Sequence, residues 1–237
     1  CVGEVMDMVG WLALRRERGR LRVEEELIGS MRVIRAVVYE PEGLAPWRLR
    51  FRLRRAERAL ARAGAGRVML GEGFPYAGRL TLLRPVDVLP FRRGCADVLV
   101  LGALRLEGVP PERGRVALSA PRLCPELERA AERLCAHVRG LLIDAPGGED
   151  YARYLQAKYG LPVTPPSAGA DVTAAFGPGG GRWGRVVELD QGGSLGGLAL
   201  GAEGVELPAD CAEQALALLW ERGEVRREAL TVYRSRA

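Results

Sequence analysis

Residues 115–166 hold the pattern that most constrains the fold of this chain. The apolar runs RVALSA, GLLIDA and LPVTPP alternate there with two segments of helical spacing, PELERAAERLCAHV and GGEDYARYLQAKYG. A strand–helix–strand order of this kind forms a parallel sheet covered by helices. Such sheets place ligands at the carboxyl ends of their strands. The pattern therefore predicts an α/β protein and the edge of the sheet at which a site lies.

The same alternation extends toward the N-terminus. MRVIRAVVYE, which begins at Met31, and RVML, residues 67–70, are two further runs with strand character. Leucines and alanines recur between them with helical spacing, whereas Trp47 and Phe51 alternate with arginine as in a strand. We expect a helix, because it completes a βαβ unit and its second half is rich in alanine. Residues 91–108 predict another helix, although DVLVLGA within them is also compatible with a strand.

The order of these elements resembles the broad Rossmann-like class. We expect a three-layer α/β domain over residues 31–176, with a mostly parallel sheet and helices on both faces. Residues 177–237 predict a small β-rich element packed on it, with RVVELD and LALGAEGVELP as hairpin strands, CAEQALALLWERG as a helix and REALTVY as an edge strand. Residues 1–30 fit one amphipathic helix, either appended to the domain or lying upstream of a native start at Met31.

The charge of the chain is dominated by arginine. The formal net charge is +5, and Lys158 is the only lysine among 35 basic residues. This bias, together with many alanines, glycines and prolines, is typical of a GC-rich bacterial genome. We therefore discount net charge as a sign of function, since it bears on non-specific binding rather than on a site. The five cysteines include no CxxC pair, which fits reduced thiols in the cytoplasm and predicts no metal site.

Candidate ligand-binding residues follow from the positions of the strand ends. The turn after GLLIDA joins a strand to a helix and contains two glycines, but its helix begins with Glu149 and Asp150. These acids favour the helix dipole and would repel an anion, so an ordinary βα turn competes with a ligand loop. The cofactor is left unassigned. The predicted strand-end residues are Glu40, Gly71, Glu72, Ser119, Asp144, Gly147 and Gly148.

A second glycine pattern is assigned to a turn. Gly179, Gly181 and Gly184 match GxGxxG, but a dinucleotide site needs this motif between a strand and a helix. RVVELD follows it and has strand character, so we interpret the glycines as a hairpin loop.

Groups for acid–base chemistry are few. His137 is the only histidine, and we place it late in a helix, away from the strand ends. No sequence typical of a serine hydrolase triad, a zinc metalloprotease or a P-loop is present. An enzymatic activity is therefore left open.

A row of arginines indicates an alternative function, the binding of a polyanion. They lie in the predicted helix after Met31, where Glu57 is the lone acid. Such a row suits RNA, DNA or an acidic protein, but a solvated helix face is the plainer interpretation. We expect the core to take Trp47 and Phe51. The predicted polyanion contacts are Arg48, Arg52, Arg55 and Arg62.

Two functions follow from these patterns. The first is binding of a small molecule or nucleotide at the strand ends, which is an analogy at the level of the fold. The second is a non-enzymatic interaction protein that uses the arginine-rich helix. Neither requires a membrane.

Overall fold

The chain folds into two compact units, each built from two stretches of sequence. Unit 1 comprises residues 1–87 and 204–225, and unit 2 comprises residues 88–203 and 226–237. The divisions between the two units fall near residues 87, 203 and 225. The domain boundaries after residues 30 and 176 stay a prediction. The computed structural model describes residues 8–71, 73–160, 164, 166–190 and 194–235.

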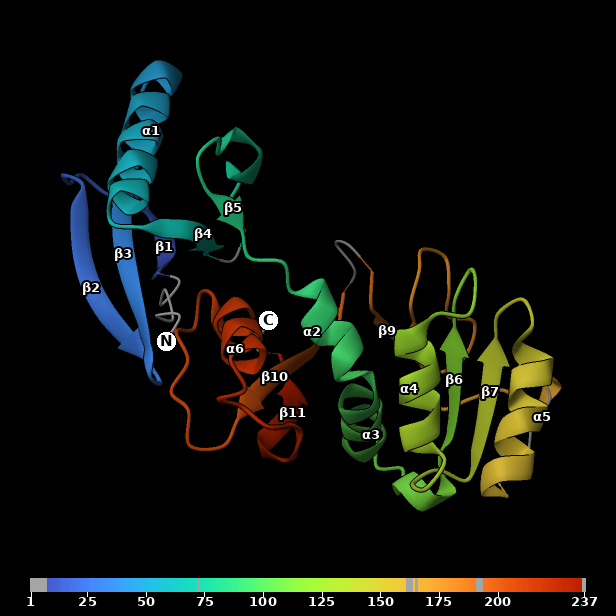
Figure 1. Ribbon diagram of the computed structural model, residues 1–237. Helices are drawn as coiled ribbons and strands as arrows, with labels where there is room; N and C mark the ends of the chain where they lie inside the picture. Colours follow the sequence, from blue (N-terminus) through green and yellow to red (C-terminus); the bar gives the residue numbers. More distant parts are fainter. Residues whose placement is uncertain (1–7, 72, 161–163, 165, 191–193, 236–237) are drawn as a thin grey trace. The chain divides into compact units, whose positions relative to one another are not determined.

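Unit 1 is built on a mixed, mostly parallel five-stranded sheet in the order β2-β3-β1-β4-β5, which we call sheet A. Its strands β3, β1, β4 and β5 run parallel, and β2 is antiparallel at the edge (Figure 1). The elements are β1 Met8–Arg15, β2 Arg22–Ile28, β3 Met31–Tyr39, α1 Pro46–Arg62, β4 Ala65–Leu70, the 3₁₀ turn η1 Ala77–Arg79, β5 Arg84–Pro85 and α6 Ala212–Glu221.

Residues 8–28 supply two strands of this sheet, so the helix predicted within residues 1–30 is wrong for the part that the structure describes. β1 lies in the middle of sheet A, paired with β3 on one side and β4 on the other. Val9 and Leu12 are fully buried. The continuous apolar run VGWLAL is what a parallel strand covered on both faces requires. Residues 8–28 are therefore integral to the fold rather than appended to it.

Helix α1 forms where the helical spacing predicts it. Pro46 occupies its first turn, where a missing N–H costs nothing. Leu49, Leu53 and Leu60 are buried against sheet A. Trp47 and Phe51, which we expected in the core, are instead 66% and 64% exposed. They lie on the opposite side of the helix from the buried leucines.

Helix α6 is attached to sheet A by Gln214, whose side-chain amide forms two hydrogen bonds with the backbone of Leu70 at the end of β4. The Leu70 N–H donates to Gln214 Oε1 (2.8 Å), and Gln214 Nε2 donates to the Leu70 carbonyl (2.9 Å). Leu216 and Leu219 are buried, as expected for an amphipathic helix. The helix predicted near the C-terminus is thus confirmed, and it belongs to unit 1.

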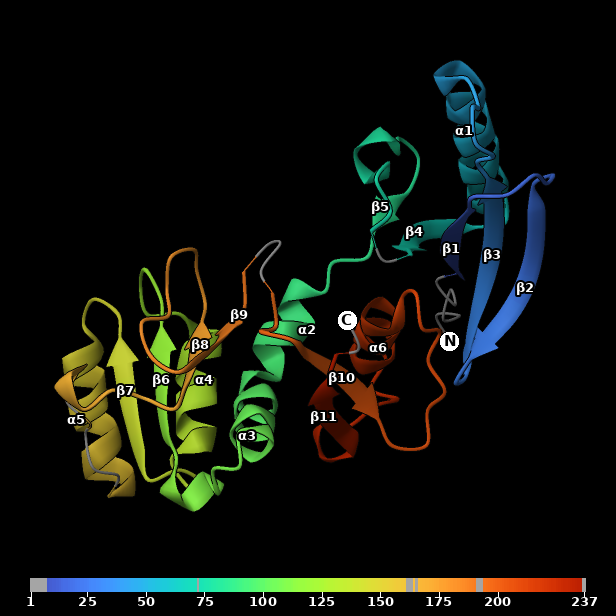
Figure 2. The same cartoon turned by 180° about the vertical axis from the view of Figure 1, so that it is seen from behind.

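Unit 2 contains a separate, wholly parallel sheet in the order β7-β6-β8-β9, which we call sheet B, and a two-stranded antiparallel sheet of β10 and β11 (Figure 2). Its strands are β6 Arg115–Ser119, β7 Gly140–Asp144, β8 Val172–Ala175, β9 Arg185–Glu188, β10 Leu198–Ala202 and β11 Leu230–Arg234. Its helices and 3₁₀ turns are α2 Leu89–Gly94, α3 Ala96–Leu106, η2 Pro111–Arg113, α4 Pro125–Leu134, α5 Gly148–Tyr159, η3 Pro166–Ala168 and η4 Arg227–Ala229.

The βα units over residues 115–160 are confirmed, but the sheet they were expected to share with residues 31–70 is not formed. β3 and β4 lie in sheet A, whereas β6 and β7 lie in sheet B. The segment predicted as one helix over residues 91–108 is divided at Cys95 into α2 and α3. Most of LPVTPP lies outside the described residues.

The C-terminal strands pair differently from the prediction. RVVELD supplies β9, which runs parallel to β8, and LALGA supplies β10, which pairs with β11. The predicted hairpin between these two segments is therefore wrong. The strand predicted in REALTVY forms over its last four residues as part of β11, whereas Arg227–Ala229 forms the 3₁₀ turn η4. Within the described residues, no helix is long and apolar enough to cross a membrane.

Candidate functional site

Sheet B contains a point where the chain reverses its direction across the sheet. β6 is the first of its strands, β7 pairs with one side of β6, and β8 pairs with the other. Loops that leave two such neighbouring strands diverge, and this opens a crevice beyond their carboxyl ends. The arrowheads of β6 and β7 point to the same end of sheet B (Figure 1). A ligand site in unit 2 is expected at this end, between β6 and β8.

A cavity of about 390 Å³ lies at this point. Its walls come from the end of β6 with the two residues that follow, from the end of β7 with the first turn of α5, and from the loop after β8. The volume is at the small end of the range of about 300–1,000 Å³ typical of ligand sites. The cavity therefore has room for a small ligand.

Ser119 and Asp144 form a hydrogen-bonded pair in the wall of this cavity. They are register partners at the ends of β6 and β7, so their side chains extend toward the same face of the sheet. The Ser119 hydroxyl donates to Asp144 Oδ2 (3.1 Å). Because the hydroxyl proton is engaged, both Ser119 Oγ and the free oxygen of Asp144 can accept hydrogen bonds from a ligand. Ser119 is only 5% exposed, which makes its orientation well defined.

Charged side chains of both signs complete the lining. Glu149 lies in the first turn of α5, and Arg182 lies in the loop after β8 and is exposed. The two carboxylates can accept hydrogen bonds, and the guanidinium can donate them to an anionic group. Pro121, Pro146 and Pro178 add apolar surface to the lining.

The loop after β8 brings its backbone close to Ser119. A Cβ atom at Gly180 would lie 3.0 Å from Ser119 Oγ and 3.1 Å from Ala175 Cβ, so any larger residue would crowd the pair. Further along, Gly184 has a φ of +56°, and a Cβ there would lie 2.0 Å from the Asp171 carbonyl oxygen. Glycine at these positions lets a short connection return the chain to a parallel strand.

The structure unites only part of the predicted set of ligand-binding residues. Ser119 and Asp144 meet in the cavity, whereas Glu40 and Gly71 belong to unit 1. Glu72 lies outside the described residues. Sequence reasoning placed all the strand ends on one sheet, and the division into sheets A and B separates them.

Gly147 and Gly148 form the turn that starts α5. Gly147 has a φ of +77° at the N-cap position. The Gly148 N–H donates to the Ala145 carbonyl (2.8 Å), so it is engaged within the turn. The cavity is lined on either side of them, by Pro146 and Glu149. Their role as ligand groups stays a prediction.

Glu40 is engaged with a tyrosine in unit 1. The Tyr76 hydroxyl donates to Glu40 Oε1 (2.7 Å). This hydrogen bond is the main reason that the pKa of Tyr76 is raised, with smaller contributions from desolvation and from the Glu40 charge. Gly71 lies near a different acid, since a Cβ atom added there would be 3.6 Å from Asp210 Oδ2.

The candidate site residues that sequence reasoning missed lie in the loop after β8, residues 177–182, most of which line the cavity. Its glycines were assigned to a hairpin because a strand follows them. The sequence did carry a signal: the loop follows DVTAAF, a third strand after two βα units, and is as glycine-rich as a ligand loop must be for close backbone approach. What the sequence does not reveal is that β9 returns parallel to β8.

The ionisable groups of the cavity lining are two carboxylates and one guanidinium. None of the lining residues in the described structure is histidine, lysine or cysteine. His137 follows α4 in the turn before β7, at the opposite end of sheet B from the cavity. The part of the chain that the structure describes contains no cluster of three His, Cys, Asp or Glu side chains able to hold a metal ion.

Comparison with known proteins gives no relationship from which a function follows. No protein-family model matches the chain, and no curated protein matches its sequence. A functional assignment therefore depends on the geometry of the site.

Proposed function

We propose that unit 2 is a Rossmann-like binding domain that takes a small hydroxylated anion, such as a ribose phosphate or a nucleoside monophosphate. The observation that carries the proposal is the Ser119–Asp144 pair in a cavity at the reversal point of sheet B. Its strand order β7-β6-β8-β9 is that of doubly wound folds, which bind ligands at this position. Helices on both faces of sheet B would make the three-layer arrangement expected from the sequence.

The polarity of the lining supports this class of ligand. Ser119 and Asp144 present acceptors, which suit the hydroxyl groups of a sugar. Arg182 presents donors from the wall formed by the loop after β8, which is glycine-rich, so its backbone can approach an anion closely. A ligand with hydroxyls at one end and a phosphate at the other satisfies both walls.

A complete dinucleotide is a poorer fit. The loop after the first strand of a dinucleotide-binding domain carries the glycines that admit the pyrophosphate. In this chain the corresponding residues, 120–124, are APRLC and contain no glycine. The volume of about 390 Å³ also favours a single nucleoside or sugar phosphate.

Calorimetric titration of the purified chain with ribose 5-phosphate and with AMP tests this function. We expect binding that weakens about tenfold or more in Asp144→Asn and in Arg182→Ala, since each removes a charged hydrogen-bonding group. Asp150→Asn and Arg129→Ala are matched controls, because both residues are exposed and lie outside the cavity lining. Alanine, a zwitterion without hydroxyls on its side chain, serves as the comparison ligand. Binding of alanine alone, or losses in the controls as large as those in the site variants, would overturn the proposal.

The four cysteines that the structure describes support a further part of the proposal, a cytoplasmic location. All four are free thiols. Unpaired cysteines persist in compartments that keep thiols reduced.

A further inference from the structure

The outer face of α1 combines exposed aromatic rings with a row of arginines. Trp47 and Phe51 are one turn apart near its start, and arginines follow on the same face over the next three turns. All of these side chains are exposed. We define the α1 outer face as Trp47, Arg48, Phe51, Arg54, Arg55, Arg58 and Arg62.

No acidic side chain neutralises this face from within the helix. The only acid in α1 is Glu57, which is 2% exposed and points to the interior. Its Oε1 atom accepts hydrogen bonds from the N–H groups of Thr81, Leu82 and Leu83. In the described part of the chain, none of the five arginines of the α1 outer face forms an ion pair. Their charge is therefore available to an anionic partner.

Of the four arginines predicted as polyanion contacts, three remain available and one is engaged. Arg48, Arg55 and Arg62 are exposed. Arg52 is half-buried and donates to the Tyr39 carbonyl at the end of β3. Arg52 thus anchors the helix, and its place in the exposed row is taken by Arg54 and Arg58.

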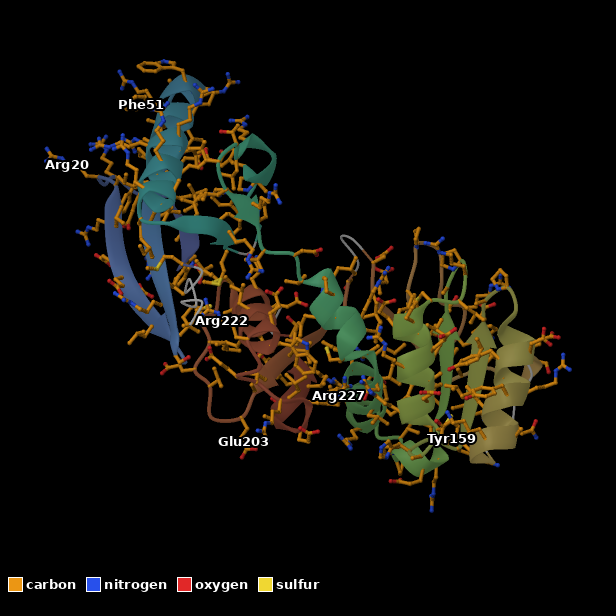
Figure 3. The ribbon with its side chains drawn as sticks, in the orientation of Figure 1. Arg20, Phe51, Tyr159, Glu203, Arg222 and Arg227 are labelled. Carbon is orange, nitrogen blue, oxygen red and sulfur yellow. The ribbon has the colours of Figure 1, made fainter. Side chains whose placement is uncertain are left out.

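The exposed aromatic rings are the second, independent observation. A helix that already buries Leu49 and Leu53 against sheet A gains nothing from Trp47 and Phe51 in water. Figure 3 labels Phe51, which projects from α1 away from the strands of sheet A. The Arg48 guanidinium lies over the Trp47 ring, 5.1 Å from its centroid. Proteins hold unstacked bases by stacking them on aromatic side chains, to which arginine adds cation–π contributions.

The loop between β1 and β2 extends the basic surface. Arg16, Arg18 and Arg20 in this loop are exposed, with Glu17 as the one acid among them. Gly19 lies against the Tyr39 ring, and Arg52 of α1 bonds to the Tyr39 carbonyl, so loop and helix meet at this residue. Figure 3 labels Arg20, which extends outward from unit 1.

We propose that the α1 outer face binds single-stranded nucleic acid, with phosphates along the arginine row and bases stacked on Trp47 and Phe51. Arg48 and Arg62 are separated by about 21 Å at 1.5 Å per residue, so the arginine row is long enough to contact several consecutive phosphates of one strand. An acidic protein would use the arginines but not the paired rings. A duplex would offer its phosphates but keep its bases stacked, so the rings favour a single strand.

Fluorescence anisotropy with a labelled twelve-nucleotide oligo(dT) tests the interaction. We expect Arg54→Glu combined with Arg55→Glu to weaken binding about tenfold or more. Arg129→Glu combined with Arg139→Glu makes the same change of net charge at two exposed positions of unit 2, and we expect an effect below about twofold. Equal losses of oligo(dT) binding in the two double variants would show that binding depends on net charge alone, and this would overturn the proposal.

The aromatic residues distinguish a nucleic acid from other polyanions. We expect Trp47→Ala combined with Phe51→Ala to weaken oligo(dT) binding about fivefold or more, since stacking contributes strongly for each base. Retention on heparin, which has no bases, should be unchanged in this variant. Unchanged oligo(dT) binding, or a matching duplex that binds as tightly as the single strand, would contradict the stacking model. Binding of an acidic peptide in preference to oligo(dT) would assign the face to a protein partner instead.

Discussion

Ser119 and Asp144 face each other at the ends of two parallel strands, with the Ser119 hydroxyl donating to Asp144 Oδ2 at 3.1 Å. The pair is held by the backbone as well as by the side chains. The Ala120 N–H donates to the Asp144 carbonyl (3.0 Å), and the Phe176 N–H donates to the Ser119 carbonyl (2.8 Å). The end of β6 is thereby fixed on both sides. A rigid pair of acceptors of this kind is suited to holding a hydroxylated ligand in one orientation.

Gly180→Ala should weaken ligand binding with little change in the stability of the fold. The added methyl group would lie 3.0 Å from Ser119 Oγ, so the hydroxyl must move and its bond to Asp144 is strained. We expect ribose 5-phosphate affinity to fall about fivefold or more, while the urea midpoint changes little. Gly78→Ala is the control, because a Cβ there meets nothing within 4 Å. An affinity equal to that of the parent protein would place the ligand away from Ser119.

Removal of the Glu57 carboxylate should destabilise unit 1. Glu57 accepts from three successive backbone N–H groups, and these lose their partner in Glu57→Ala. We expect a loss of about 3 kcal/mol in the free energy of unfolding, measured by urea titration, since each hydrogen bond to a charged group contributes about 1.5–3 kcal/mol and water partly replaces those of the exposed Thr81 and Leu82. Glu57→Gln keeps one acceptor and should lose less. A loss in Glu57→Ala as small as that in the exposed control Glu17→Ala would contradict this role.

Arg227 holds the C-terminal segment to the helices of unit 2. Its guanidinium donates to Asp97 Oδ1 and to the Gly94 carbonyl (2.7 Å), and Figure 3 labels it beside α3. The Asp97 side chain is only 8% exposed, so Arg227→Met leaves a buried charge with the more distant Arg133 at 3.8 Å. We expect a loss of about 3 kcal/mol in unfolding free energy.

A double-mutant cycle separates this ion pair from simple packing. Asp97→Asn combined with Arg227→Met should cost clearly less than the sum of the two single changes, because neither charge is then left unpaired. Additive losses would show that the two side chains do not stabilise each other.

The thiol of Cys211 should be nearly inert in the native protein. Its pKa is raised to about 12, mainly by burial and then by the Asp210 charge. At pH 8.5 we expect iodoacetamide to modify the half-exposed Cys124 first and Cys211 only after unfolding. Rapid labelling of Cys211 in the absence of denaturant would contradict its burial.

The same shift implies a loss of stability in alkali. The unfolded thiol ionises near its ordinary value of 9.0, below the folded value of about 12. The unfolded chain therefore binds fewer protons above pH 9, and the contribution of Cys211 declines as pH rises from about 9 to about 12. Urea titrations at pH 8.5 and 10.5 should show a smaller decrease in Cys211→Ala than in the parent protein. An equal decrease in both would exclude this thiol as a cause.

Elements whose signal is local could be predicted from the sequence. The apolar residues of a strand or helix recur with a period that is visible within a short stretch of sequence in β6, α4, β7 and α5. These four elements form as expected. β1 was missed because VGWLAL is too apolar for strand alternation and is followed by the charged run RRERGR. Its position as the central strand of sheet A depends on pairing with β3 and β4, which lie far along the chain.

Pairing between distant segments accounts for the other differences. A nine-residue connection between β8 and β9, residues 176–184, is shorter than parallel crossovers ordinarily are, so a hairpin was the natural expectation. Trp47 and Phe51 were expected in the core, but both are exposed. The helical spacing already contradicts that expectation, since a helix that buries Leu49 and Leu53 turns those two rings to the opposite side.

The part of the candidate site at the ends of β6 and β7 could be predicted from the sequence. Ser119 and Asp144 were located by the rule that ligands bind at the ends of parallel strands. The loop over residues 177–182 was not, because its place beside Ser119 follows from the parallel return of β9. Glu40 and Gly71 are separated from this site because the strands form two sheets, and no local sequence pattern indicates that division.

An NMR titration of backbone amides with ribose 5-phosphate tests most directly whether unit 2 binds a ligand at the ends of β6 and β7. We predict shifts concentrated in the three segments that line the cavity, residues 119–121, 144–149 and 177–182, with saturation that Asp144→Asn abolishes or strongly weakens. Shifts confined to other parts of the chain, or saturation that is unchanged in Asp144→Asn, would contradict a binding site at the reversal point of sheet B.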